Sequence, residues 1–170
     1  MIADRDALAE MVGLILSFAR DDAKREPRTL IDLDSLVLEV CEDAADAGEA
    51  VTYEGNRGTT DLSRPMALGR VGSNLVDNAL KYAGAADVRL TAEPDRVVVA
   101  VEDQGPGIPR SQREKVFEPF YRVDSSRNRE TGGVGLGLPV ARSIAREHGG
   151  DIILAARKGG GLSARRELTA

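Results

Sequence analysis

The chain has 170 residues, of which 42% are apolar and 30% charged, and its formal net charge is −5. Such a composition predicts a soluble globular protein with room for one well-buried domain, and its acidic balance argues against a protein that coats nucleic acid. A single cysteine (Cys41) and a single histidine (His148) exclude a disulfide framework and the usual zinc sites.

The chain contains no candidate membrane span or signal peptide. The longest apolar run near its start is Met11–Leu16, six residues, whereas a membrane helix needs about 20. We therefore expect the chain to be cytoplasmic, and this expectation is compatible with a longer parent protein that is an inner-membrane sensor.

The first predicted element is an amphipathic helix over residues 4–25. Its apolar residues follow the i, i+3, i+4, i+7 spacing of one helix face, namely Leu8, Met11, Val12, Ile15, Phe18 and Ala19. The apolar stripe is narrow, and the other faces are charged. The helix therefore either packs on its own domain or belongs to a bundle whose partner helices lie elsewhere.

The rest of the chain predicts three more helices and five strands. Helices are expected over 32–47, 65–83 and 136–148, and strands over 50–54, 87–92, 96–102, 151–156 and 162–168. Between Asp103 and Gly133 we expect an irregular segment with at most one short helix, and a loop of that length is usually functional. This order predicts an α+β fold: a two-layer α/β sandwich with helices on one face of a mixed, mostly antiparallel sheet.

Three polar residues share one side of the helix expected over 65–83. Asn74, Asn78 and Lys81 are spaced i, i+4, i+7. An amide oxygen is a ligand that Mg²⁺ accepts, and a lysine supplies a point charge to phosphate oxygens. The three residues therefore suit a metal–phosphate group, although an ordinary exposed helix face gives the same pattern.

Two glycine-containing segments suit other parts of a nucleotide. In Asp103-Gln-Gly-Pro-Gly-Ile108, a carboxylate at a strand end can accept a hydrogen bond from the amine of a base such as adenine, and the glycines permit close approach. The segment 132–138 (Gly-Gly-Val-Gly-Leu-Gly-Leu) opens a helix, where glycine-rich backbone binds anions. An ordinary Asp-Gly loop and a flexible hinge are the respective alternatives.

The segment between these two motifs is basic and aromatic. Residues 110–129 carry six basic and three acidic side chains. Phe117, Phe120 and Tyr121 are half of the six aromatic residues of the chain. The segment therefore suits contact with a polyphosphate beneath a lid, and a solvated surface is the alternative.

In this order the motifs resemble those of sensor histidine kinases. Residues 74–82 (Asn-Leu-Val-Asp-Asn-Ala-Leu-Lys-Tyr) are similar to the N box of that family, 103–108 to its G1 box, 117–122 (Phe-Glu-Pro-Phe-Tyr-Arg) to its F box and 132–138 to its G2 box. The resemblance covers about residues 32–168. It implies the ATP-binding catalytic domain of a two-component kinase, with the Bergerat fold shared by heat-shock chaperone and mismatch-repair ATPases.

The resemblance also implies roles for the matched residues, with ATP and Mg²⁺ as cofactors. Asn78 would hold Mg²⁺, Lys81 and Tyr82 would meet the nucleotide, and Asp103 would bind the adenine amine. Residues 109–132 would form the ATP lid. The other implied ATP-binding residues are Asn74, Gly105, Gly107, Ile108, Tyr121, Arg122, Gly132, Gly133, Val134, Gly135, Leu136, Gly137 and Leu138.

The same resemblance divides the chain into three parts. Residues 1–26 would be the second helix of the dimerisation and histidine-phosphotransfer hairpin, 27–31 a linker, and 32–170 the ATP-binding catalytic domain. The hairpin helix that carries the phosphoacceptor histidine is absent, and His148 is expected to cap a helix C-terminus instead. The chain would therefore bind Mg-ATP and supply the γ-phosphoryl group to a histidine elsewhere, without phosphorylating itself.

The implied partners are ATP or ADP, the histidine-bearing hairpin, a response regulator through the full-length protein, and a second copy in a weak homodimer through the helix over 4–25. Two other functions stay open. One is a nucleotide-binding regulatory module without transfer activity. The other is an anti-sigma-factor-type serine kinase of the same fold, against which the F box and the N-terminal helix argue.

Overall fold

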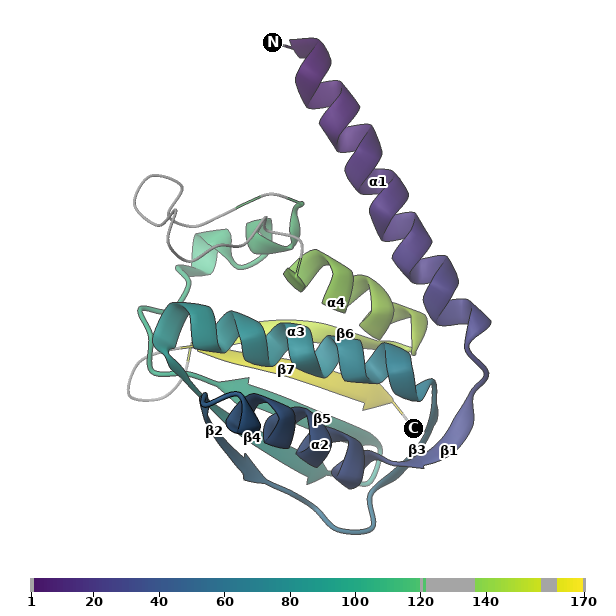
Figure 1. The fold of residues 1–170 in the computed structure, drawn as a ribbon, viewed down its shortest axis with the longest axis vertical. Coiled ribbons are helices and arrows are strands. Elements are labelled where there is room, and N and C mark those ends of the chain that lie inside the picture. Colours follow the sequence, from purple (N-terminus) through teal and green to yellow (C-terminus); the bar gives the residue numbers. More distant parts are fainter. Residues whose placement is uncertain (1, 120, 122–136, 157–161, 170) are drawn as a thin grey trace.

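The computed structural model describes the chain except for residues 1, 120, 122–136, 157–161 and 170 (Figure 1). Its helices are α1 (Ile2–Arg25), α2 (Leu33–Asp46), α3 (Pro65–Ala83) and α4 (Gly137–Glu147). Its strands are β1 (Thr29–Asp32), β2 (Ala50–Glu54), β3 (Thr60–Ser63), β4 (Ala85–Ala92), β5 (Arg96–Glu102), β6 (Gly150–Ala156) and β7 (Leu162–Thr169). Every helix and strand predicted from the sequence is present.

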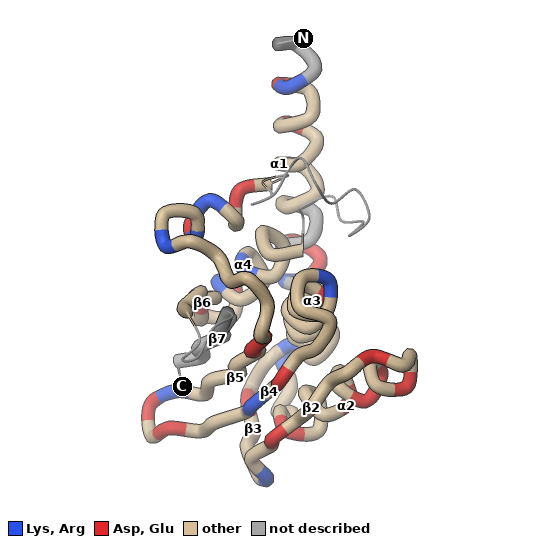
Figure 2. The backbone as a smooth tube through the Cα atoms, turned by 90° about the vertical axis from the view of Figure 1, so that its left-hand side faces the viewer, with Lys and Arg blue, Asp and Glu red and all other residues tan. Residues whose placement is uncertain are grey.

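Five strands form the main sheet in the order β2-β4-β5-β7-β6. β2 runs parallel to β4, and the other three neighbouring pairs are antiparallel. Helices α2, α3 and α4 lie on one side of this sheet, as the two views related by 90° show (Figures 1 and 2). The predicted α+β fold, a two-layer sandwich with a mixed, mostly antiparallel sheet, is confirmed.

Two short strands were not predicted. β1 and β3 pair antiparallel in a separate sheet, from Thr29 opposite Ser63 to Asp32 opposite Thr60. Each has four residues, which is too short for a periodic pattern to be recognised. Most of the expected linker, 27–31, therefore belongs to a strand.

The segment after β5 also differs from the prediction. Its described residues hold two 3₁₀ helices, Arg110–Gln112 and Lys115–Phe117, where at most one short helix was expected. Three-residue turns carry no hydrophobic repeat, so the sequence alone did not indicate them.

Helix α2 starts at Leu33 because Asp32 is its N-cap and accepts a hydrogen bond from the Ser35 N–H at 3.1 Å.

The core lies between the helices and the sheet, and its largest contributions come from α3 and the central strands. Its buried residues include Leu68, Val71, Leu75 and Val76 of α3, Val88 and Leu90 of β4, Val99 and Val101 of β5, and Ala141, Ile144 and Ala145 of α4. Residues from these four elements thus share one apolar cluster, which fixes α3 and α4 against the sheet.

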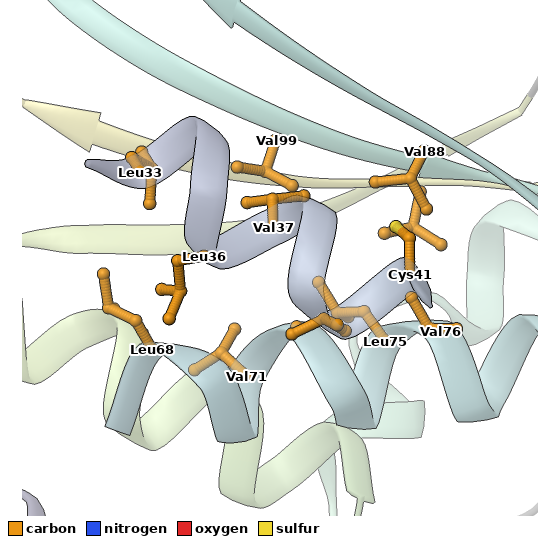
Figure 3. A pocket seen from close by; sticks show the side chains of 13 residues that line it. Leu33, Leu36, Val37, Cys41, Leu68, Val71, Leu75, Val76, Val88 and Val99 are labelled. Atoms are coloured by element: carbon orange, nitrogen blue, oxygen red, sulfur yellow. The ribbon is translucent and has the colours of Figure 1, made fainter. Parts of the chain in front are cut away.

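A small cavity remains in this core, between α2, α3 and the sheet (Figure 3). Its volume is about 20 Å³, so it has room for about one water molecule and none for a nucleotide. Burial, with a smaller contribution from Glu42, raises the pKa of the Cys41 thiol in its wall to about 11. The cavity lining is apolar apart from that thiol: Leu33, Leu36, Val37, Val40, Cys41, Leu68, Val71, Gly72, Leu75, Val76, Val88, Val99 and Val101.

Helix α1 contacts α4 and extends beyond the rest of the molecule (Figure 1). Among its described side chains, four large apolar ones are exposed, Leu8, Met11, Leu14 and Ile15, whereas Val12 is buried. In the described part of the chain, α1 included, no helix has both the length and the apolar character needed to cross a membrane.

Candidate functional site

Helix α3 is the platform of the predicted site. Pro65 starts the helix, where its missing N–H is not needed, and Gly84 ends it in the left-handed conformation at φ 73° while donating its N–H to the Leu80 carbonyl at 2.9 Å. Its apolar side is buried in the core and its polar side faces solvent, so a boundary between the two runs along the helix. Asn74 and Asn78 are half-buried at that boundary, and Lys81 and Tyr82 are exposed.

The Asp103 segment packs against the C-terminal turn of α3. Asp103 follows β5 directly and is 6% exposed, and its carboxylate accepts a hydrogen bond from the Gly105 N–H at 2.9 Å. A Cβ on Gly105 would stand 3.1 Å from the Tyr82 carbonyl oxygen and 3.0 Å from the Ala83 Cβ. The absence of a side chain at Gly105 thus permits the close approach that brings Asp103 beside the end of α3.

The second glycine of this motif is required by its backbone conformation. Gly107 has a φ of 72°, in the left-handed region that glycine adopts without strain. Ile108, which follows it, is half-buried and packs on the core cluster. The two glycines therefore serve different purposes, close approach at Gly105 and a left-handed turn at Gly107.

The start of α4 meets the middle of α3. The Asn74 side-chain amide donates a hydrogen bond to the Gly137 carbonyl at 3.2 Å, and Leu138 is buried. The end of the predicted phosphate-binding segment therefore lies beside the polar residues of α3. Six other predicted residues, Arg122, Gly132, Gly133, Val134, Gly135 and Leu136, lie outside the described residues.

The described residues of the segment after Gly107, 108–119 and Tyr121, are held by their own hydrogen bonds and by the core. Arg113 Nε donates to the Ile108 carbonyl at 3.1 Å, and the Tyr121 hydroxyl donates to Gln112 Oε1 at 2.9 Å. Tyr121 packs on the core cluster, as Ile108 does. Ile108 and Tyr121, the two predicted site residues here, thus belong to a segment anchored next to the Asp103 motif.

Arg142 of α4 is a residue that sequence reasoning missed. Its side chain is 14% exposed and forms ion pairs with Glu114 at 2.8 Å and with Asp151 at 3.0 Å. Its guanidinium also lies 4.2 Å from the centroid of the Phe117 ring. Arg142 therefore joins the segment after β5 to α4 and β6, and no local pattern signals this because the partners come from separate elements.

The Arg142 contacts change the pKa values of both carboxyl groups. The hydrogen bond from Arg142 lowers the pKa of Glu114, which is otherwise exposed. Burial alone would raise the pKa of Asp151, but hydrogen bonds from Arg142, from the Ile152 N–H and from Arg146 together outweigh burial and lower it. Both groups therefore stay ionised to lower pH than they would without these contacts.

His148 lies at the far end of α4 from Gly137. Its Nδ1 is 2.9 Å from the Ile144 carbonyl oxygen, and its Nε2 accepts a hydrogen bond from the Arg64 N–H at 3.4 Å. These partners assign the proton to Nδ1. The expected place of His148 at a helix C-terminus is confirmed, and the ring also contacts the start of α3.

The donor chemistry at α3 fits a magnesium–phosphate group. The described residues contain no group of three or more His, Cys, Asp or Glu side chains that could enclose a metal ion. Mg²⁺ in nucleotide sites commonly takes one or two protein oxygens and completes its sphere with phosphate oxygens and water. The amide oxygen of Asn78, next to a lysine one helical turn on, matches that pattern.

Comparisons with known proteins identify the family of the chain. Residues 63–169 match the family described as histidine kinase-, DNA gyrase B- and HSP90-like ATPases. The sensor histidine kinase GtrS of Pseudomonas aeruginosa is 38% identical over 159 residues, which are 94% of this chain and 33% of GtrS. The sensor-like histidine kinase SenX3 of Mycolicibacterium smegmatis is 35% identical over 170 residues, 95% of this chain and 44% of SenX3.

A solved structure shares the fold. The nucleotide-free catalytic domain of the histidine kinase ThkA matches with a TM-score of 0.71 at 28% identity, and the match covers 84% of this chain and 95% of that one. The chain belongs to the histidine kinase-, DNA gyrase B- and HSP90-like ATPase family. Its relatives are sensor histidine kinases, and it spans less than half the length of GtrS or SenX3.

Proposed function

We propose that this chain binds Mg-ATP and supplies the γ-phosphoryl group to a histidine on a dimerisation hairpin. One observation carries the proposal: the Asp103 motif and the start of α4 both pack against the half of α3 that holds Asn74, Asn78 and Lys81. The contacts that support this are the Asn74–Gly137 hydrogen bond and the approach of Gly105 to Tyr82 and Ala83. Membership of an ATPase family supports it independently.

Each part of this arrangement has a chemical role in the proposal. Asp103 accepts a hydrogen bond from the adenine amine, and the Lys81 ammonium attracts phosphate oxygens. Asn78 provides an oxygen for Mg²⁺, which neutralises phosphate charge when bound. The N–H groups at the start of α4 face the negative end of the nucleotide. Phosphoryl transfer depends mainly on such positioning and charge neutralisation.

The acceptor histidine in this proposal is outside the chain. Along α4, His148 is about 16 Å from Gly137 at 1.5 Å per residue, and both of its ring nitrogens are engaged. The exposed apolar side chains of α1, such as Leu8 and Met11, suit packing against other hairpin helices. We assign 1–26 to that hairpin, 27–31 to the junction and 32–170 to the ATP-binding domain.

The wider setting follows from the same proposal. A second copy would meet this one weakly through α1, and a response regulator would receive the phosphoryl group from the hairpin of the full-length protein. ATP supply places the domain in the cytoplasm, with a parent protein of the sensor kinase type.

The test is transfer from γ-labelled ATP. The chain alone should remain unlabelled, whereas adding a separately made histidine hairpin should give acid-labile label on the hairpin, and a hairpin with its histidine replaced by glutamine should stay unlabelled. Label on His148 would contradict the proposal. ATP binding without transfer to any hairpin would favour the regulatory module, and acid-stable label on a serine of an added protein would favour the serine kinase.

A further inference from the structure

The N-terminus of α3 has no cap of its own. Arg64 occupies the N-cap position, and its side chain makes no capping hydrogen bond. The first N–H groups of a helix lack partners within the helix and are usually bound by a serine, threonine, aspartate or asparagine at that position. The start of α3 therefore needs an acceptor from elsewhere in the chain.

Glu26 supplies that acceptor. Its two carboxylate oxygens accept hydrogen bonds from the Met66 N–H at 2.9 Å and the Ala67 N–H at 3.0 Å, across 40 and 41 residues of sequence. Its backbone carbonyl also accepts a hydrogen bond from Arg64 Nε at 2.8 Å. A negative charge at a helix N-terminus is further favoured by the helix dipole.

Glu26 is the first residue after α1, which ends at Arg25. The cap therefore fixes the point at which α1 leaves the domain. Among the hydrogen bonds of the described residues, no other residue between α1 and β1 bonds through both its side chain and its backbone to the start of α3 and its N-cap residue Arg64.

Weaker contacts flank Glu26 on both sides. Before it, Asp22 Oδ2 lies 3.7 Å from Arg70 Nη2 of α3, and Lys24 Nζ lies 3.6 Å from Glu147 Oε2 of α4. After it, Arg28 donates to the Glu147 carbonyl at 3.4 Å. Exposed pairs of this kind contribute little singly. Together with Glu26 they join the end of α1 to both α3 and α4, and we call this set of contacts the junction clasp.

We propose that Glu26 is a positioning residue, which fixes the direction of α1 relative to the nucleotide end of α3, the half of the helix that carries Asn74, Asn78 and Lys81. The distance along α3 from Met66 to Asn78 is about 18 Å at 1.5 Å per residue, and the buried side of α3 makes that span rigid. Since the proposed function makes α1 part of the histidine hairpin, the clasp sets the geometry in which histidine and nucleotide meet. This consequence rests on the proposed function, whereas the placement of α1 does not.

The placement is tested by a distance measurement on the full chain. Spin labels at Ser17→Cys on α1 and Thr91→Cys on β4, two exposed positions, are introduced with Cys41 replaced by alanine. The unaltered junction should give one narrow distance distribution, and Glu26→Ala should broaden it. Glu10→Ala removes an equal charge from an exposed position of α1 that forms no ion pair with the described residues, and it should leave the distribution narrow.

A second variant keeps the test decisive if Glu26→Ala lowers stability. Glu26→Gln keeps the size of the side chain, but its NH₂ group faces a backbone N–H donor in place of an acceptor, so it should broaden the distribution less than alanine does. A narrow, unshifted distribution in both folded variants would overturn the proposal.

The functional consequence has its own measurement. Glu26→Ala should leave ATP affinity unchanged and slow transfer to the hairpin by about tenfold or more, because a misplacement of roughly 1 Å between reacting groups has effects of that size. Equal transfer rates in the two proteins would overturn the positioning role. Failure of the unaltered chain to bind ATP would refute the proposed function alone, since the distance measurement needs no nucleotide.

Discussion

The two ends of the α3–α4 pair are built in different ways. At the nucleotide end, Asn74 binds the Gly137 carbonyl, and Gly105 packs on Tyr82 and Ala83. At the junction end, Arg64 donates to His148, and Glu26 caps α3. The nucleotide end joins short contiguous motifs, whereas the junction end joins single residues far apart in sequence. The first kind of structure is visible in a sequence, and the second is not.

The nucleotide end should be the easier of the two to break. Gly105→Ala places a Cβ 3.1 Å from the Tyr82 carbonyl oxygen and 3.0 Å from the Ala83 Cβ, so the loop that carries Asp103 must shift. Overpacking of this kind costs about 1–3 kcal/mol, and we expect ATP affinity, measured by calorimetry, to fall by about tenfold or more.

A matched control for this substitution exists on α3. A Cβ on Gly69 would meet no atom within 4 Å, so Gly69→Ala should leave ATP affinity unchanged. Equal affinities for Gly105→Ala and Gly69→Ala would show that the close approach at Gly105 does not matter for binding.

The contrast between the two ends also explains how much the sequence could predict. Helix and strand positions followed from hydrophobic periodicity, glycines and prolines, and the site residues proposed in 74–82 and 103–108 could be named from the sequence because each motif is contiguous. Glu26 stands in a stretch of mixed charge with no pattern of its own, and the helix that it caps starts 39 positions later, at Pro65. Arg142 was missed for the same reason, since Glu114, Phe117 and Asp151 are brought to it only by the fold.

Between the two ends, α3 can be strengthened without touching either. Gly72 lines the core cavity, and a Cβ there would lie 3.5 Å from Val40 Cγ2, an ordinary contact distance. Gly72→Ala should raise the free energy of unfolding by about 1 kcal/mol from helix propensity, plus a few tenths from the new packing contacts.

Urea unfolding of the two α3 variants separates these contributions. Gly69→Ala gains the propensity alone, because its Cβ meets open space. Gly72→Ala should therefore be the more stable protein. If Gly69→Ala were the more stable, the cavity would not accept the added methyl group, and the packing between α2 and α3 would be tighter than described.

The smallest expected effect concerns Asp151, which binds Arg142 and Arg146. Its pKa is lowered from 3.8 in the folded chain, so its ionised form stabilises the fold above the unfolded pKa, and this contribution disappears as pH falls through the folded pKa. Since the side chain is 38% exposed, solvent screening limits the contribution to about 0.5 kcal/mol at neutral pH.

Asp151→Asn should therefore lower stability by that amount at neutral pH and by nothing in strong acid, as measured by urea unfolding across the pH range. Asp95→Asn is the control, because Asp95 is exposed in the turn between β4 and β5 and forms no ion pair with the described residues. A loss of stability for Asp151→Asn that is equal at all pH values would contradict the role of its charge.

The central claim, that the polar side of α3 and the Asp103 motif form a Mg-ATP site, is tested most directly by calorimetry with and without Mg²⁺. The unaltered chain should bind ATP more tightly than GTP, because Asp103 accepts from the adenine amine but would face the guanine carbonyl, and Mg²⁺ should strengthen ATP binding. Asn78→Ala should lose that strengthening while it keeps most of the metal-free affinity. Equal strengthening by Mg²⁺ in the two proteins, or equal affinity for ATP and GTP, would contradict the assignment of the site.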